Sequence, residues 1–117
     1  MQRMWKVATT DEYDEWFDSQ DHDTAIEVIG VVSLLSQYGP RLARPHADTL
    51  KGSHYAHMKE LRVRTASSEI RVAFAFDPQR QAVLLIAGDK QGVNESRFYR
   101  KLIAKADMLY ARHLHRE

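Results

Sequence analysis

The chain has 117 residues, of which 44% are hydrophobic and 28% charged, and it contains no cysteine. This composition predicts one globular domain, residues 1–117, and it excludes a disulfide framework and a thiolate metal site. No apolar run reaches transmembrane length and the N-terminus lacks the apolar core of a signal peptide, so we expect a cytoplasmic protein with no membrane partner.

Charge is divided unevenly along the chain. Residues 1–40 carry two basic and eight acidic residues, whereas residues 41–117 carry fifteen basic and eight acidic ones. Five of the six histidines also lie in the second part. Such a split favours a bipolar surface whose basic half contacts an anionic partner, but two opposite solvated faces would give the same count.

The first predicted elements are a short strand and a helix. Residues 4–8 are mostly apolar, which is typical of a short edge strand. Thr9 and Glu12 have the spacing of a capping box, so we expect a helix that begins after Thr9 and ends near Ser19.

A second helix is predicted from its apolar stripe. Apolar side chains recur at helical spacing between residues 25 and 38, which predicts a helix that begins near Asp21 or Asp23 and ends at Tyr38. The Gly-Pro pair that follows is a strong stop signal. Because the two helices are short and adjacent, we expect them to form an antiparallel helical hairpin.

The centre of the chain predicts an antiparallel β-hairpin. Residues 56–64 and 69–76 are rich in β-branched and aromatic residues and flank a short polar segment. Because side chains alternate across a strand, pairing the apolar faces brings polar and small residues together on the other face. These residues are Met58, Glu60, Arg62, Arg64, Glu69, Arg71, Ala73 and Ala75. An open face with three guanidinium groups suits a phosphate chain. Ion pairs of Arg62 and Arg71 with Glu60 and Glu69 are the alternative role.

The remaining segments complete an α+β pattern. Residues 41–49 read as an irregular basic loop, residues 77–80 as a type I turn, and residues 82–87 as a strand buried on both faces. After a polar turn, Asn94 or Ser96 begins a last amphipathic helix. The order strand, two helices, three strands and a helix predicts an α+β fold with helices packed on an antiparallel sheet of about four strands.

Six segments, which lie between residues 39 and 90 of a similarity that extends over about residues 5–114, are specific when they are taken together in this order. They are Gly39-Pro40-Arg41-Leu42, Leu50-Lys51-Gly52, Lys59-Glu60-Leu61-Arg62-Val63, Ile70-Arg71-Val72, the apolar strand 83–87, and Asp89-Lys90. With the closing helix they resemble the HigB-like branch of the RelE/ParE superfamily of toxins. The resemblance implies a RelE-like fold and a type II toxin that cleaves messenger RNA on the ribosome. It also implies a partner, a helix-turn-helix antitoxin encoded by the adjacent gene.

The resemblance also implies roles for four residues. Glu60 and Arg62 fall on the family's ELR motif, Arg71 falls on the arginine that contacts the scissile phosphate, and Lys90 falls on the basic residue after the last strand. Two departures leave the proton-transfer groups open. Met58 and Glu60 stand on the open face where cleaving relatives often carry two lysines. Residues 88–91 lack the aromatic residue and the two lysines that relatives often show there.

Metal-free RNA cleavage needs a base for the 2′-hydroxyl, a group that stabilises the phosphorane, and an acid for the leaving oxygen. Arginine suits the second task, and histidine titrates in the range that the other two need. We assign the catalytic set to Arg71, Lys90, Glu60, His57 and His54. We assign RNA binding to Arg62, Arg64, Lys51, Arg41, Arg44 and Tyr99. We expect no metal site and no cofactor.

Three functions are open at this stage. The first is an RNA endonuclease toxin, the second a non-catalytic toxin of the gyrase-poisoning type on the same fold, and the third a plain RNA- or protein-binding domain. Two assemblies are open as well, a homodimer and a toxin–antitoxin heterotetramer.

Overall fold

Five strands form one mixed sheet, the central layer of the computed structural model, which describes residues 4–116. The strands are β1 (Val7–Thr9), β2 (Ala47–Thr49), β3 (Lys59–Arg64), β4 (Glu69–Phe76) and β5 (Ala82–Asp89). Their order across the sheet is β1-β5-β4-β3-β2. β1 runs parallel to β5, and the other neighbouring strands are antiparallel.

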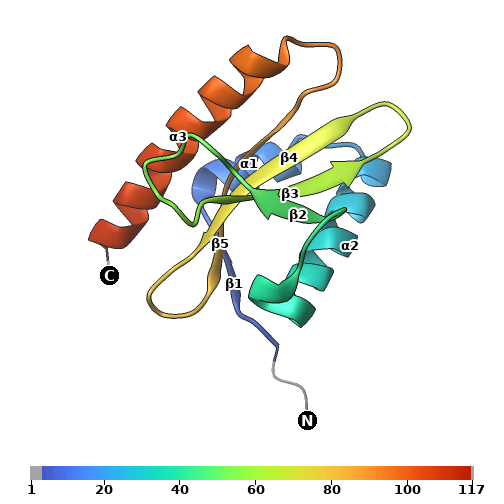
Figure 1. Ribbon diagram of the computed structural model, residues 1–117. Helices are drawn as coiled ribbons and strands as arrows, with labels where there is room; N and C mark the ends of the chain where they lie inside the picture. Colours follow the sequence, from blue (N-terminus) through green and yellow to red (C-terminus); the bar gives the residue numbers. More distant parts are fainter. Residues whose placement is uncertain (1–3, 117) are drawn as a thin grey trace.

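Helices cover both faces of the sheet (Figure 1). They are α1 (Asp11–Asp18), α2 (His22–Tyr38) and α3 (Glu95–His115), and a short 3-10 helix, η1 (Gly39–Arg41), follows α2. α1 and α2 share one core cluster with one face of the sheet, and α3 shares a second cluster with the other face. The expected α+β fold with a closing helix is confirmed. No helix in the described part of the chain is long and apolar enough to cross a membrane.

Side-chain caps begin the three α-helices. Asp21 caps α2 and Asn94 caps α3, because each side-chain oxygen accepts the backbone N–H three residues further on. The cap of α1 is Thr10, whose hydroxyl accepts from the backbone N–H of Tyr13 at 3.0 Å. The prediction of Thr9 as this cap is therefore wrong by one residue. Thr9 instead ends β1, where it pairs with β5.

The predicted sheet needs three corrections. β2 lies in the segment expected to be an irregular loop and pairs with β3, because three residues are too few to show a strand's alternation. Residues 56–58, expected to open the hairpin, form a turn instead, in which the Met58 N–H donates to the Tyr55 carbonyl at 3.0 Å. β1 is an edge strand as expected, but its partner lies far along the chain and runs parallel to it.

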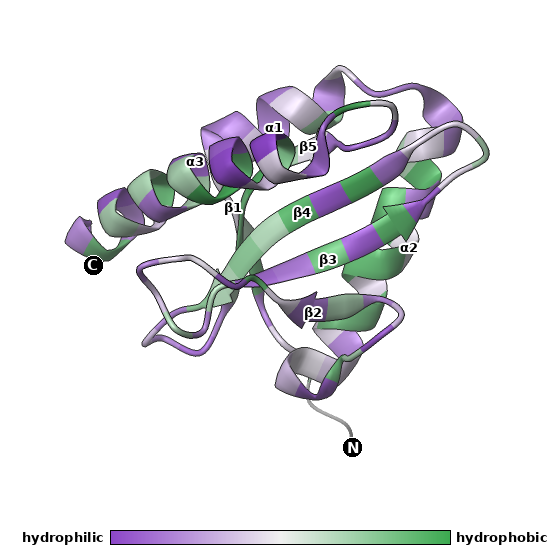
Figure 2. Cartoon of the chain, turned by 45° about the horizontal axis from the view of Figure 1, so that its top comes forward, coloured by the Kyte–Doolittle hydropathy of each residue, from purple (hydrophilic) through white to green (hydrophobic). Residues whose placement is uncertain are grey.

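The two faces of the central hairpin lie as the alternation predicts, and Figure 2 shows polar and apolar residues alternating along β3 and the first half of β4. Arg62 lies opposite Arg71, and both belong to the polar face. One correction concerns the open face, because Ala73, Ala75 and Met58 are buried in the cluster that α3 covers. Only the polar half of this face, beyond the small residues, is open.

The end of α2 generates a stability prediction. Gly39 has a φ of +57°, and a Cβ at this position would lie 2.3 Å from Nε1 of Trp5. We expect Gly39→Ala to lower the free energy of unfolding by about 1–3 kcal/mol, because it adds backbone strain and a clash. The matched control is Gly30→Ala on the exposed side of α2, where a Cβ meets nothing within 4 Å.

We expect the control to raise the free energy of unfolding by about 0.5–1 kcal/mol, because alanine loses less backbone entropy on folding than glycine does. Urea denaturation followed by circular dichroism measures both changes. Equal effects of the two substitutions would contradict the proposed role of Gly39.

Candidate functional site

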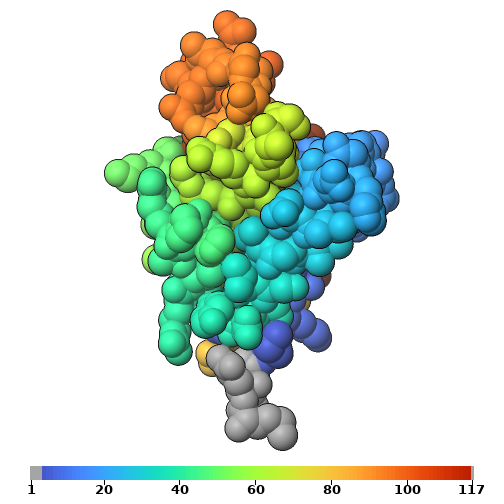
Figure 3. All heavy atoms as spheres, turned by 90° about the vertical axis from the view of Figure 1, so that its right-hand side faces the viewer, coloured from blue at the N-terminus to red at the C-terminus, as the bar shows by residue number. Residues whose placement is uncertain are grey.

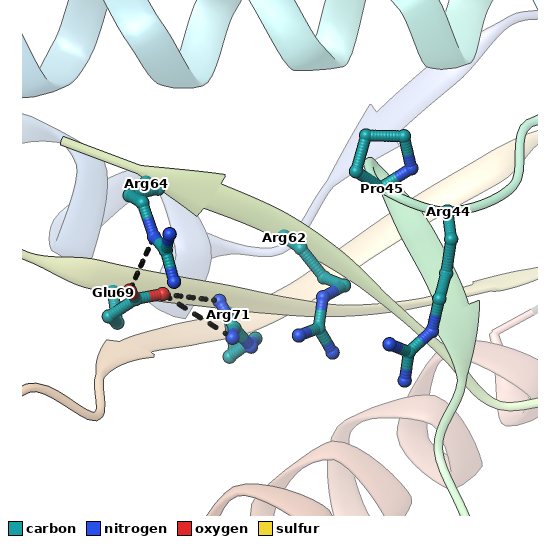
Figure 4. A pocket seen from close by; sticks show the side chains of 6 residues that line it. All are labelled: Arg44, Pro45, Arg62, Arg64, Glu69 and Arg71. Carbon is teal, nitrogen blue, oxygen red and sulfur yellow. Dashed lines mark hydrogen bonds and ion pairs between the residues drawn. The ribbon is translucent and has the colours of Figure 1, made fainter.

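Two adjoining cavities lie over the open half of the polar sheet face. The first has a volume of about 310 Å³ and is drawn in Figure 4; it is lined by Arg44, Pro45, Arg62, Arg64, Glu69 and Arg71. The second has a volume of about 620 Å³; it is lined by Arg44, Asp48, Thr49, Leu50, Lys51, Glu60, Arg62, Lys90, Glu95, Ser96 and Tyr99. Because the cavities share two arginines, we treat them as one surface, the cationic groove.

The groove is built from strands and from the first turn of α3. β3 and β4 supply its floor, the segment before β2 supplies one wall, and the start of α3 supplies the other. The loop before α3 is tied to the hairpin, because Asp89 accepts the Glu69 N–H at 2.9 Å and the Lys90 N–H donates to the Glu69 carbonyl at 2.9 Å. Figure 3 shows this loop against the end of the β3–β4 hairpin.

Glu60 lies at the centre of the groove's floor and is only 4% exposed. Its Oε1 accepts from the Tyr99 hydroxyl at 2.8 Å, and its Oε2 accepts from Arg62 Nη1 at 3.0 Å. Arg71 Nε lies 3.7 Å from the same Oε1 and donates to the Tyr99 oxygen at 3.1 Å. A buried carboxylate needs such partners, so Glu60 serves first to position two arginines and a tyrosine.

Arg71 is buried as well, with 3% exposure. Its Nη1 donates to the Ile70 carbonyl at 3.0 Å, while its contacts with the Glu69 carboxylate are long, at 3.5 Å. The side chains of Arg62 and Arg64 are 25% and 79% exposed. An anion in the groove therefore meets Arg62 and Arg64 first and reaches Arg71 at the floor.

Neighbouring charges, hydrogen bonds and burial shift the pKa values of Glu69, Glu95 and Tyr99 in the groove. Burial raises the pKa of Glu69, but the hydrogen bond from Arg64 and the charges of Arg71 and Lys90 outweigh burial and hold this pKa below its ordinary value. The hydrogen bond from Lys90 lowers the pKa of Glu95. Burial and the neighbouring Glu60 raise the pKa of the Tyr99 phenol. Tyr99 is therefore a hydrogen-bond donor at neutral pH and not a base.

The described lining carries six cations and four carboxylates. Each carboxylate already contacts a cation; the pairs are Asp48 with Arg44, Glu60 with Arg62, Glu69 with Arg64, and Glu95 with Lys90. The excess positive charge, set in a concave surface, attracts anions. The arginines form the ion pairs of the alternative role, and they also line a cavity in which an anion could bind.

Most of the residues assigned from sequence come together in this groove. They are Glu60, Arg62, Arg64, Arg71, Lys90, Lys51, Arg44 and Tyr99. His54, His57 and Arg41 are exposed but line neither cavity. His54 lies on the loop before β3, where its backbone N–H donates to Asp107 of α3 at 3.0 Å. No histidine among the described residues lines the groove.

Sequence reasoning missed several polar residues of the lining. Asp48 and Thr49 lie on the unpredicted strand β2, and Glu95 and Ser96 lie in the first turn of α3. The spacing of Arg44 and Asp48 hints at their ion pair, whereas the contact between Lys90 and Glu95 depends on how the loop before α3 folds.

Comparison with known proteins gives one family and two similar relatives. Residues 15–111 match the family described as "Phage derived protein Gp49-like (DUF891)". The chain is 39% identical over 109 residues to HigB2 of Mycobacterium tuberculosis, covering 92% of this chain and 54% of HigB2. It is 44% identical over 96 residues to HigB3 of the same organism, covering 82% of each chain. Both relatives are named as candidate toxins, and this chain spans about half the length of HigB2.

A solved structure shares the fold. The chain is similar to a mutant of the Escherichia coli toxin RelE in the free state, with a TM-score of 0.59 over 87% of this chain and 96% of RelE. Sequence identity to RelE is 10%, so this likeness concerns the fold alone.

Proposed function

The chain belongs to the Gp49-like family and to the HigB-like branch of the RelE/ParE toxins, and we propose that it is the toxin of a toxin–antitoxin pair. We further propose that it is an endonuclease that cuts messenger RNA on the ribosome. The observation that supports this activity is the cationic groove, in which Arg62 and Arg71 lie opposite each other on neighbouring strands.

In the proposed reaction a 2′-hydroxyl oxygen gives its proton to a base and attacks the adjacent phosphorus, and the bond from phosphorus to the 5′-oxygen of the next nucleotide breaks. The products are a 2′,3′-cyclic phosphate and a 5′-hydroxyl, whose oxygen takes up a proton from an acid. Charge builds up on the phosphate oxygens in the transition state, and preorganised guanidinium groups stabilise it without rearrangement. Arg62 lines both cavities and Arg71 lies on the floor of the first, so both suit this task. Lys90 adds a charge at the α3 end, where its ammonium contacts Glu95 and lies 5.9 Å from the centre of the Tyr99 ring.

For the proton-transfer groups, we keep His54 and His57 as candidates under one condition. His54 and His57 can act only on an RNA that reaches beyond Lys51 onto the loop before β3, because neither lines the groove. Because no histidine of residues 4–116 lines the groove, a second candidate function is a non-catalytic toxin that binds its target through the same cations. Mapping of new RNA 5′ ends after induced expression separates the two, because only the endonuclease creates them.

The arginines of the floor generate an activity prediction. We expect Arg62→Ala and Arg71→Ala to slow RNA cleavage by a factor on the order of 10²–10³, because each removes a charge-stabilising donor. The matched control is Arg80→Asn, at an exposed turn outside the groove where φ is +63°, a conformation that asparagine tolerates. Cleavage is measured by 5′-end mapping and by growth arrest.

Arg71→Ala leaves Glu69 and Glu60 with one fewer partner, so a thermal melt must first show that the variant is folded. Arg62→Ala removes a more exposed side chain and tests the site if Arg71→Ala does not fold. Full toxicity of both folded variants would place the active site elsewhere.

The charge of the groove predicts metal-independent chemistry. The described carboxylates of the lining are already bound to arginine or lysine, and the net positive charge repels a divalent cation. We expect cleavage to leave a 2′,3′-cyclic phosphate on the upstream fragment and to proceed when ribosomes are kept intact by cobalt hexammine, which supplies charge but no open ligand position. A strict requirement for magnesium at the chemical step would contradict this prediction.

We propose that a partner binds on the side of α1 and α2, which cover the sheet face opposite the cationic groove. The chain has no lysine or arginine between Lys6 and Arg41, and α1 and α2 with their caps carry many acidic residues. Between these helices lies an apolar cavity of about 350 Å³, whose lining includes Tyr13 and Phe17 of α1 and the exposed Ile29 of α2. This combination suits a basic segment with apolar anchors, and we propose that the helix-turn-helix antitoxin from the adjacent gene supplies it.

Co-expression followed by pull-down tests this pairing. We expect the toxin to co-purify with its antitoxin and growth to resume. Reversing the charges of Asp14, Glu15 and Asp18 to lysine should weaken the complex, because the electrostatic attraction is lost. The matched variant Arg44→Glu with Arg64→Glu alters the groove and should leave the complex intact. The reverse result would place the antitoxin in the groove.

A further inference from the structure

The outer side of α3 carries basic residues that the groove does not use. Arg97, Arg100, Lys101 and Lys105 are all exposed, and none forms an ion pair with the described residues. α3 itself contains two acidic residues, Glu95 and Asp107. Glu95 contacts Lys90, and Asp107 accepts from Ser53 and from the loop before β3. We name these four cations the α3 ridge.

The ridge begins where the groove ends. Ser96 and Tyr99 line the groove, and Arg100 lies one helical turn after Ser96, on the same side of the helix. Arg97, Lys101 and Lys105 form a second row at four-residue spacing, so successive members lie about 6 Å apart along the helix axis. An RNA strand that leaves the groove at the start of α3 therefore meets a row of exposed cations, of which Lys105 also interacts electrostatically with Glu12 of α1.

A solvated helix surface is the plain alternative, and the charge pattern argues against it. Surface helices usually mix both signs of charge, whereas the ridge has one sign. Like charges four residues apart also destabilise a helix, and the ridge contains two such pairs, Arg97 with Lys101 and Lys101 with Lys105. This arrangement is unfavourable for folding alone and favourable for binding an anion.

We propose that the α3 ridge is a second RNA-binding surface, which holds the phosphates of the single strand after it leaves the cationic groove. This inference rests on the proposed function, because it needs RNA in the groove. Lysine and arginine contacts with phosphates release counterions, so binding through the ridge adds affinity without sequence preference and makes it depend on salt.

Binding of two RNA lengths tests the ridge. The probes are single strands of about six and about twenty nucleotides, the first short enough to fill the groove alone, with 2′-O-methyl groups that block cleavage. The ridge variant is Lys101→Gln with Lys105→Gln, and the matched control is Lys6→Gln with Arg80→Asn. The ridge variant should bind the longer RNA more weakly. The magnitude of the negative slope of log K against log salt should decrease by about 1.4, or about 0.7 for each of the two lost phosphate contacts.

The short RNA should bind the ridge variant and the wild-type chain equally, and the control should match the wild type with both probes. Unchanged binding of the longer RNA by a folded ridge variant overturns the inference. An equal loss with both lengths also overturns it, because the lysines then act through overall charge. Loss of antitoxin binding in place of RNA binding assigns the ridge to a protein partner and overturns it as well.

The same experiment tests the proposed function separately. Arg62→Ala alters the groove and should weaken the binding of both RNA probes. If Arg62→Ala binds both probes as the wild type does, the groove is not an RNA site. The ridge and the groove can therefore fail independently.

Discussion

The buried carboxylate of Glu60 is the interaction on which the groove depends. A buried charge is costly unless its hydrogen bonds are complete, and Glu60 completes them with Tyr99 of α3 and Arg62 of its own strand. Arg71 adds its charge from the neighbouring strand. One carboxylate thus fixes the start of α3 over the sheet and sets two arginines side by side.

The far end of α3 is held by different interactions. The Tyr110 hydroxyl donates to the Phe76 carbonyl, and Arg112 forms two hydrogen bonds with Glu12 of α1, at 2.6 and 2.8 Å. The bond from Arg112 lowers the pKa of Glu12 to about 2. Small residues under the middle of the helix, Ala73 and Ala75, let it lie close to the sheet. α3 is therefore fixed at both ends, so the wall of the groove that it supplies is preorganised.

The alternation of side chains along strands and the spacing of capping residues predicted those features that depend only on residues close together in the sequence. Alternation placed Glu60, Arg62 and Arg71 on one face of the hairpin, and capping chemistry found the starts of α2 and α3. Pairing between distant segments was not visible, which is why the parallel contact of β1 with β5 and the short strand β2 were missed. Nor did the sequence indicate that His54 and His57 lie outside the cationic groove.

The site residues divide in the same way. Residues on regular strands reached the groove as predicted, because alternation fixes the face of each. His54 and His57 precede β3 by only a few residues, but their loop turns toward α3, where Ser53 and the His54 N–H bind Asp107. A carboxylate of α3 thus decides where this loop lies, and nothing in the loop's own sequence indicates it.

The sheet separates two surfaces of opposite charge, and this separation constrains any mechanism of inhibition. A partner confined to the cavity between α1 and α2 does not reach the cationic groove, because the sheet lies between them. The strands are packed on both faces, and packed cores are not continuously deformable. Inhibition from that side would therefore act by steric exclusion of a large RNA assembly, while a short RNA would still reach the groove.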